Sequence, residues 1–183
     1  MQLWLLLGTT RASGGTVVDA LWQYLSFFTV LTNLFIAAVA TATVFRPDAE
    51  RGLAGGIARG CATTAIVVVG ISYHLLLRNV WDPQGWQLVT DVSLHYVMPI
   101  LGLLWWLFPP QTRLPKRAPL LWGLYPVAYL AYALIRGEWI GAYPYPFIDV
   151  PALGYARALI NAAGLILVFL ATGALLRWLA RPR

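Results

Sequence analysis

The sequence predicts an all-α protein, a polytopic transmembrane helix bundle with five full spans and an N-terminal partial helix, in a single domain over residues 1–183. Three observations lead to this fold class. Apolar residues make up 60% of the chain and charged residues only 11%, whereas soluble domains have roughly 45–50% and about 25%. Five apolar runs are long enough to cross about 30 Å of hydrocarbon, which takes about 20 helical residues. Prolines and charged residues separate these runs.

This composition excludes a soluble globular domain, a disordered chain and a nucleic-acid binder. The net charge is +6, but the basic residues lie in short loops between apolar runs, as membrane topology requires. The single cysteine, Cys61, excludes an internal disulfide, and no zinc-binding Cys/His pattern is present. We therefore expect no cofactor and no metal site. The strong preference for arginine over lysine is typical of GC-rich codon usage and indicates a bacterial source.

The N-terminal segment 2–7 is apolar but too short to span a membrane. It lacks the charged n-region of a signal peptide. It is either an interfacial turn or the tail of a first helix that begins upstream of Met1, and we favour the second interpretation.

Five spans follow this segment. A backbone in lipid must satisfy its own hydrogen bonds, so the spans are expected to be helices. We place them at 21–45, 57–77, 89–108, 119–135 and 157–179. The segments that end or separate them are Arg46-Pro47-Asp48, Trp81-Asp82-Pro83, Pro109-Pro110 and the loop with Pro144 and Pro146.

The charges of the loops predict the orientation. Three segments on one side carry nine basic residues, namely Arg46, Arg51, Arg59, Arg113, Lys116, Arg117, Arg177, Arg181 and Arg183. The other side carries Arg11, Arg78, Arg136 and Arg157. By the positive-inside rule, the first side and the C-terminus face the cytoplasm. The expected location is the bacterial cytoplasmic (inner) membrane.

Apart from arginines near the span ends, three ionisable side chains lie within the predicted spans: His74, Asp91 and His95. Inserting an ionisable side chain into a membrane span costs at least about 2.5–3.5 kcal/mol on insertion scales. Its presence therefore calls for a structural or functional explanation. Asp91 precedes His95 by four residues and shares its helical face. An aspartate in this position can hold an imidazole in one tautomer and stabilise its charged form. Alternatively, Asp91 caps the start of its span. His74 is expected at a depth similar to that of His95.

The first predicted span carries polar residues at spacings of four, three and four: Trp22, Ser26, Thr29 and Asn33. On one continuous helix they form a single stripe. The stripe places two hydroxyls at the depth of His95. A hydroxyl beside an imidazole is the smallest set of side chains that can carry out nucleophilic attack on an ester. The alternative is structural, because Ser and Thr in membrane helices mostly bond to their own backbone or to a neighbouring helix.

Further polar residues lie within the last two predicted spans. Tyr125, Tyr129 and Tyr132 form a second stripe, and Arg157 and Asn161 share a face of the last span. These side chains are candidates for lining one outward-opening cavity. The alternatives are a packing seam of tyrosines and an Arg157 that binds lipid headgroups.

Three segments carry a resemblance to a known family: Trp22 to Thr29, Leu94-His95-Tyr-Val-Met-Pro99, and Gly137 to Asp149 with its Tyr143-Pro-Tyr-Pro-Phe147 core. Their order and spacing resemble the androgen-induced / ADTRP-like family of six-helix membrane proteins. Animal members hydrolyse fatty acid esters of hydroxy fatty acids with a membrane-embedded Thr and His. The resemblance implies that the family's first helix corresponds to a segment upstream of Met1.

The resemblance also implies site residues. The family's nucleophilic Thr lies in a Leu-Thr-Phe step, which corresponds to Leu25-Ser26-Phe27. Ser therefore replaces Thr at this position, and Thr29, one turn on, is the alternative nucleophile. The family His precedes a Pro by five residues, whereas His95 precedes Pro99 by four.

The sequence therefore predicts a membrane-embedded hydrolase of lipid esters, with membrane lipids or acyl esters as its partners. Ser26 or Thr29 attacks, His95 acts as base, and Asp91 orients His95. The residues expected to bind substrate are Trp22, Asn33, Tyr125, Tyr129, Tyr132, Arg157 and Asn161. Two alternatives remain: a non-catalytic lipid-binding or transport protein, and a haem or metal protein with His74 and His95 as ligands.

Overall fold

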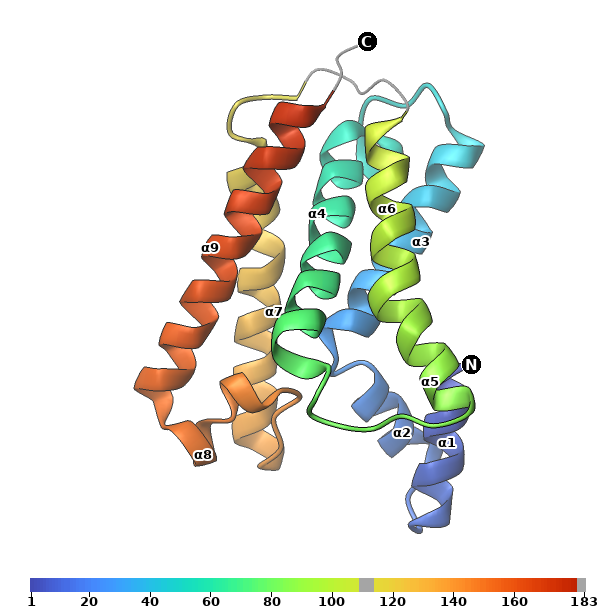
Figure 1. Cartoon of the computed structure of the whole chain (residues 1–183), viewed down its shortest axis with the longest axis vertical. Coiled ribbons are helices and arrows are strands. Elements are labelled where there is room, and N and C mark those ends of the chain that lie inside the picture. Colours follow the sequence, from blue (N-terminus) through green and yellow to red (C-terminus); the bar gives the residue numbers. More distant parts are fainter. Residues whose placement is uncertain (109–113, 181–183) are drawn as a thin grey trace.

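The computed structural model describes residues 1–108 and 114–180, and every regular element in this part of the chain is helical (Figure 1). In chain order the elements are α1 (Gln2–Ala12), α2 (Val17–Tyr24), α3 (Phe28–Phe45), η1 (Gly52–Ala54), α4 (Gly56–Ser72), η2 (Tyr73–Leu77), α5 (Trp86–Val92), η3 (Ser93–Val97), α6 (Met98–Leu107), α7 (Ala118–Ile140), η4 (Pro146–Ile148), α8 (Val150–Leu153) and α9 (Tyr155–Leu179).

Five helices are long and apolar enough to cross a membrane, which confirms an all-α bundle with five candidate spans. They are Phe28–Phe45, Gly56–Leu77, Trp86–Leu107, Ala118–Ile140 and Tyr155–Leu179. The second and third are continuous through η2 and η3. Most ends agree with the prediction within three residues, but the first helix begins seven residues after 21 and the fourth extends five residues beyond 135. Five of the residues used to predict the ends and orientation lie outside the described residues: Pro109, Pro110, Arg113, Arg181 and Arg183.

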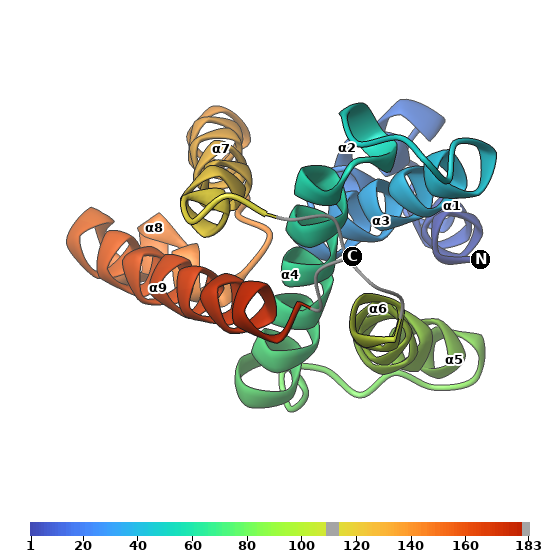
Figure 2. The same ribbon diagram turned by 90° about the horizontal axis from the view of Figure 1, so that it is seen from above.

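Helix α4 occupies the centre of the bundle. Its span is 56% buried, whereas the other four are 22–28% buried. Figure 2 shows α4 between two groups, with α3 and α6 on one side and α7 and α9 on the other. Small residues along α4, such as Gly60, Ala62 and Ala65, are fully or nearly fully buried and allow this close approach. The indole of Trp106 on α6 donates to the carbonyl of Leu176 on α9 at 2.9 Å, which joins the two groups.

We expect Gly60→Ala to lower the thermal unfolding midpoint strongly. A Cβ at Gly60 would overlap the indole ring of Trp122, which is 1% exposed and cannot move aside. Overpacking of this kind costs about 1–3 kcal/mol. The matched control is Gly164→Ala on α9, where a Cβ meets no atom within 4 Å. Thermal unfolding of both variants in the same detergent checks the prediction, and equal midpoints would contradict it.

The structure corrects the prediction of one helix over 21–45. Helix α2 ends at Tyr24 and α3 begins only at Phe28. At the break, the backbone N–H and the hydroxyl of Ser26 both donate to the carbonyl of Gln23, at 3.0 and 2.6 Å, and Phe27 is extended. A hydroxyl that bonds its own backbone in this way competes with the helix ladder. Trp22 and Ser26 therefore do not share a helix with Thr29 and Asn33, and the predicted stripe is wrong.

Two tyrosines of α7 hold the break in place. Tyr129 donates its phenol proton to the carbonyl of Ser26 at 2.8 Å, and Tyr132 donates to the carbonyl of Leu25 at 3.3 Å. The last carbonyls of a helix have no partner within the helix, and an unsatisfied carbonyl is costly in an apolar surrounding. Two members of the predicted tyrosine stripe thus satisfy the end of α2.

The N-terminal helices α1 and α2 form a short hairpin at one end of the bundle (Figure 1). With 11 residues, α1 has a length of roughly 16 Å, shorter than the roughly 30 Å of a bilayer's hydrocarbon core. A capping box starts α2, in which Thr16 and Asp19 each bond the backbone N–H of the other. The hydrogen bonds from Thr16 lower the pKa of Asp19. The loops 78–85 and 141–154 lie at the same end as this hairpin, and the loop 46–55 lies at the opposite end.

Candidate active site

Two π-helical turns face each other in the half of the bundle near the α1–α2 hairpin. They are η2, which ends the second span, and η3, which interrupts the third. Pro99 explains η3, because proline has no N–H to donate to the carbonyl of His95 four residues earlier. The N–H of Met98 instead bonds the carbonyl of Ser93, five residues back. Such turns occur frequently at functional sites, and these two carry Tyr73, His74 and His95.

A buried cluster of three side chains joins these turns. The Nδ1 atom of His95 lies 3.0 Å from the carbonyl oxygen of Asp91 and 3.2 Å from its Oδ1. This is the contact that the four-residue spacing predicts. The phenol of Tyr73 donates to Oδ2 of Asp91, and its ring stacks on the His95 imidazole with centroids 4.0 Å apart. Tyr73 and Asp91 are 5% and 4% exposed.

This arrangement fixes the chemistry of His95. The proton on Nδ1 faces two oxygens of Asp91, so Nδ1 is the donor. The other nitrogen, Nε2, then carries the lone pair and is the atom able to accept a proton. The backbone carbonyl of Asp91 thus fixes the tautomer, and the carboxylate 3.2 Å away stabilises the charged ring that forms when Nε2 acts as a general base.

Thr29 lies in the first turn of α3, directly after the break. Its backbone N–H donates to the phenol oxygen of Tyr145 at 3.3 Å, and its Oγ1 is 3.5 Å from the same oxygen. Tyr145 belongs to the loop between α7 and η4 and stacks on Phe147, with ring centroids 5.1 Å apart. Burial raises the pKa of the Tyr145 phenol, so this hydroxyl stays protonated.

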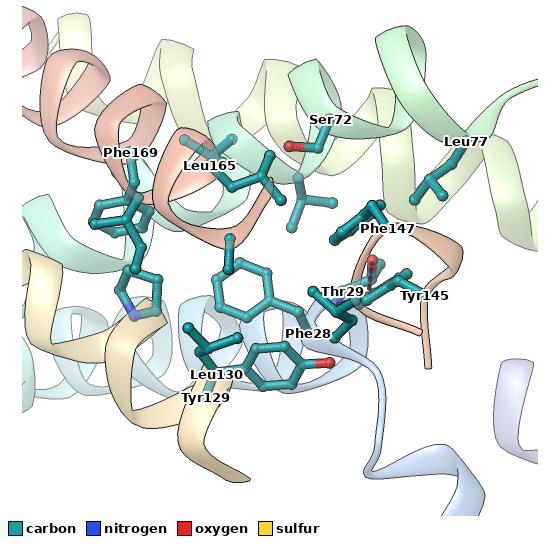
Figure 3. A pocket seen from close by; sticks show the side chains of 16 residues that line it. Phe28, Thr29, Ser72, Leu77, Tyr129, Leu130, Tyr145, Phe147, Leu165 and Phe169 are labelled. Carbon is teal, nitrogen blue, oxygen red and sulfur yellow. Dashed lines mark hydrogen bonds between the residues drawn. The ribbon is translucent and has the colours of Figure 1, made fainter. Parts of the chain in front are cut away.

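These groups line one cavity, of about 320 Å³, and no hydrogen bond joins Thr29 to His95 across it. Thr29 and Tyr145 line it on one side, and Tyr73, Asp91 and His95 line it on another. A second cavity is narrow, with a volume of about 90 Å³, and runs between α3, α4, α7 and α9 (Figure 3). Thr29 and Tyr145 line both cavities. The Thr29 hydroxyl therefore lies where a narrow apolar space meets a wider one that contains the histidine.

Ser26, the other predicted nucleophile, lies in a different setting. It is 2% exposed, and its hydroxyl donates to the carbonyl of Gln23 at 2.6 Å. It lines neither of the two cavities. Its hydroxyl supports the break between α2 and α3.

The remaining residues predicted to bind substrate are engaged mostly in structural contacts. Asn33 donates to the carbonyl of Thr29 at 2.8 Å, and Asn161 donates to the carbonyl of Phe147 at 3.0 Å. Tyr125 is hydrogen-bonded to Thr32 at 3.1 Å. Tyr129 lines the narrow cavity, while Tyr132, Arg157 and Trp22 are exposed or face the break. Arg136 stacks on the ring of Trp22 at 5.6 Å.

The structure also bears on the haem and metal alternatives. His74 uses both ring nitrogens, one with Tyr96 at 3.3 Å and one with Arg78 at 3.2 Å. Axial ligation of a haem would require breaking one of these contacts. Within residues 1–108 and 114–180, no three His, Cys, Asp or Glu side chains group closely enough to hold a metal ion. In this part of the chain, the metal alternative with His74 and His95 as ligands therefore has no third ligand of these types.

Two residues of the site were missed by the sequence analysis: Tyr73 and Tyr145. Tyr73 directly precedes His74 in an apolar span, and a phenol at the depth of a buried carboxylate is a signal that was available. Tyr145 lies in the Tyr-Pro-Tyr-Pro-Phe segment, whose position against α3 depends on tertiary contacts that no local pattern encodes.

No family model, no curated protein and no solved structure matches the chain.

Proposed function

We propose that the protein is a membrane-embedded hydrolase of lipid esters, with Thr29 as nucleophile and His95 as base. The observation that carries this proposal is the common cavity, which the Thr29 hydroxyl and the Asp91–His95 pair both line. Nucleophile, base and an orienting carboxylate are the parts that acyl transfer to a hydroxyl requires. Between the two predicted nucleophiles, the cavity favours Thr29, because the hydroxyl of Ser26 is bonded to Gln23.

The reaction has two halves. First, Oγ1 of Thr29 attacks the acyl carbonyl carbon while Nε2 of His95 takes its proton. The tetrahedral intermediate then collapses, the bond to the alcohol oxygen breaks, and His95 returns the proton to that oxygen. In the second half, water attacks the acyl-enzyme and gives its proton to His95. The fatty acid leaves, and the proton returns to Thr29. Asp91 stabilises the imidazolium in each half.

The negative oxygen of the intermediate needs hydrogen-bond donors. The first N–H groups of α3 have no partners within the helix, and the helix dipole adds partial positive charge at this end. Thr29 belongs to that first turn. The protonated phenol of Tyr145 lies against Thr29 from the other side. Phe28, Val30 and Tyr145 are therefore the donors that we propose, rather than the asparagines, which bond to backbone carbonyls.

The substrate class follows from the location of the cavities within the spans. A lipid ester enters such a bundle from the bilayer, and the resemblance to the androgen-induced / ADTRP-like family implies fatty acid esters of hydroxy fatty acids or similar acyl esters. The excess of arginines in the loop 46–59 and near the C-terminus favours a cytoplasmic location for that side. The site then opens toward the outer leaflet of a bacterial cytoplasmic membrane.

Ester turnover by the purified protein tests this proposal. We expect the wild-type protein in detergent to hydrolyse p-nitrophenyl acyl esters and His95→Ala to reduce turnover by at least about 10²-fold, the scale of general-base catalysis. His74→Ala is the matched control, because His74 lies on the other π-turn, η2, and bonds Tyr96 and Arg78 instead of Asp91. Equal rates for His95→Ala and the wild type would contradict the proposal.

A lipid-binding or transport protein without catalysis is the second candidate. The narrow apolar cavity favours it, since such a cavity binds an alkyl chain whether or not chemistry follows. This candidate predicts a co-purifying lipid and no ester turnover above that of His95→Ala.

A further inference from the structure

We infer that the narrow cavity holds the acyl chain of the substrate and that the ring of Phe169 ends the space for that chain. This inference rests on the proposed ester hydrolysis and assigns one cavity to each half of the ester.

The lining of the narrow cavity fits an alkyl chain. It consists almost entirely of aliphatic and aromatic side chains from α3, α4, α7 and α9 and from η4. Of the two phenols in it, that of Tyr129 donates to the carbonyl of Ser26 and that of Tyr145 contacts Thr29. Little of the lining therefore recognises a polar ligand, and the small volume of about 90 Å³ favours a single unbranched chain.

The cavity has a reactive end and a closed end. Figure 3 shows Thr29 and Tyr145 at one end and Phe169 at the other, with Phe28 and Leu165 between them. Phe169 is 1% exposed and belongs to a core cluster with Trp106 and Trp122. A side chain packed in this way forms a fixed wall.

The wider cavity then receives the alcohol. His95 lines that cavity but not the narrow one, and it must return a proton to the leaving alcohol oxygen. The attacked carbonyl lies at Thr29, which belongs to both. The volume of about 320 Å³ allows an alcohol that is larger than the acyl chain.

A chain-length profile tests the inference through a matched pair of variants. Leu165→Phe adds bulk inside the cavity, whereas Leu167→Phe makes the same change at a side chain that is 66% exposed and outside it. With p-nitrophenyl esters of two to sixteen carbons, we expect Leu165→Phe to lower kcat/KM at the wild-type optimum by at least about tenfold and to shift the optimum to shorter chains. Leu167→Phe should match the wild type. Identical profiles for both variants would overturn the inference.

Phe169→Ala gives the opposite shift. Removing the ring opens the closed end, so the optimum should move to esters longer by about three carbons. Phe108→Ala, at a ring that is 76% exposed, is the control for a Phe-to-Ala change. An unchanged optimum in a folded Phe169→Ala protein would show that another residue ends the chain site.

Photo-crosslinking separates failure of this inference from failure of the proposed hydrolysis. The probe is decanoic acid with a diazirine at its terminal carbons, which needs no turnover. Crosslinks at Phe169 and its neighbours without ester hydrolysis would support the chain site and reject the hydrolase. Hydrolysis with crosslinks confined to other helices would support the hydrolase and reject the chain site.

Discussion

Replacing Thr29 with valine is expected to lower kcat/KM for ester hydrolysis by at least about 10³-fold, since removal of a nucleophile from a catalytic unit has effects of this size or larger. Valine keeps the branched shape of threonine and leaves the backbone N–H that bonds Tyr145. Folding should therefore change little, and the loss should appear in kcat. Steady-state kinetics in detergent, together with thermal unfolding, measures both quantities.

Ser26→Ala is the matched control for this variant. The Ser26 hydroxyl bonds the carbonyl of Gln23 at the break between α2 and α3. Its removal should cost about 1 kcal/mol of stability, the usual net value of one hydrogen bond, and leave kcat within about threefold. The reverse pattern, with Ser26→Ala inactive and Thr29→Val active, would show that the break rearranges in the working enzyme.

Asp91→Asn is expected to lower kcat by about 10²–10⁴-fold, the range known for orienting carboxylates in hydrolytic triads. The Asp91 carboxylate lies 3.2 Å from Nδ1 of His95 and stabilises the imidazolium, and a neutral amide removes that charge. The backbone carbonyl of residue 91, 3.0 Å from Nδ1, is the same in the variant and keeps the proton on Nδ1. The nitrogen NMR shifts of labelled His95 should therefore show an unchanged tautomer, which assigns the loss to the missing charge.

Two further variants separate this orienting effect from a general loss of structure. Asp19→Asn changes an aspartate that caps α2 far from His95 in the sequence, and it should retain full turnover. Tyr73→Phe removes one hydrogen bond to Asp91 and keeps the ring that stacks on His95. It should give a smaller loss than Asp91→Asn. A larger loss for Tyr73→Phe would assign the orienting role to Tyr73.

The spans were predictable because length and hydropathy alone decide whether a helix crosses a membrane. The contact between Asp91 and His95 was predictable too, because a spacing of four residues survives even a π-turn between them. Both features depend on local sequence. The ends of helices with clear breakers, such as Arg46-Pro47, were located within a few residues.

The break at residues 25–27 escaped prediction for a physical reason. Leu25, Ser26 and Phe27 contain neither proline nor glycine, and the apolar run continues through them. The phenols of Tyr129 and Tyr132, about a hundred residues later, satisfy the carbonyls that the break exposes. Only the tertiary structure reveals this support. The choice of Thr29 over Ser26 depends on the same break, so it was equally inaccessible from the sequence.

Covalent labelling tests the central claim, an activated Thr29 hydroxyl, most directly. A fluorophosphonate reacts with an activated hydroxyl by loss of fluoride, and peptide mapping of the labelled protein identifies the residue. We predict a single adduct on Oγ1 of Thr29 in the wild-type protein, absent in Thr29→Val and in His95→Ala and present in Ser26→Ala. An adduct on Ser26, or labelling of Thr29 that is equally fast in His95→Ala, would contradict the claim.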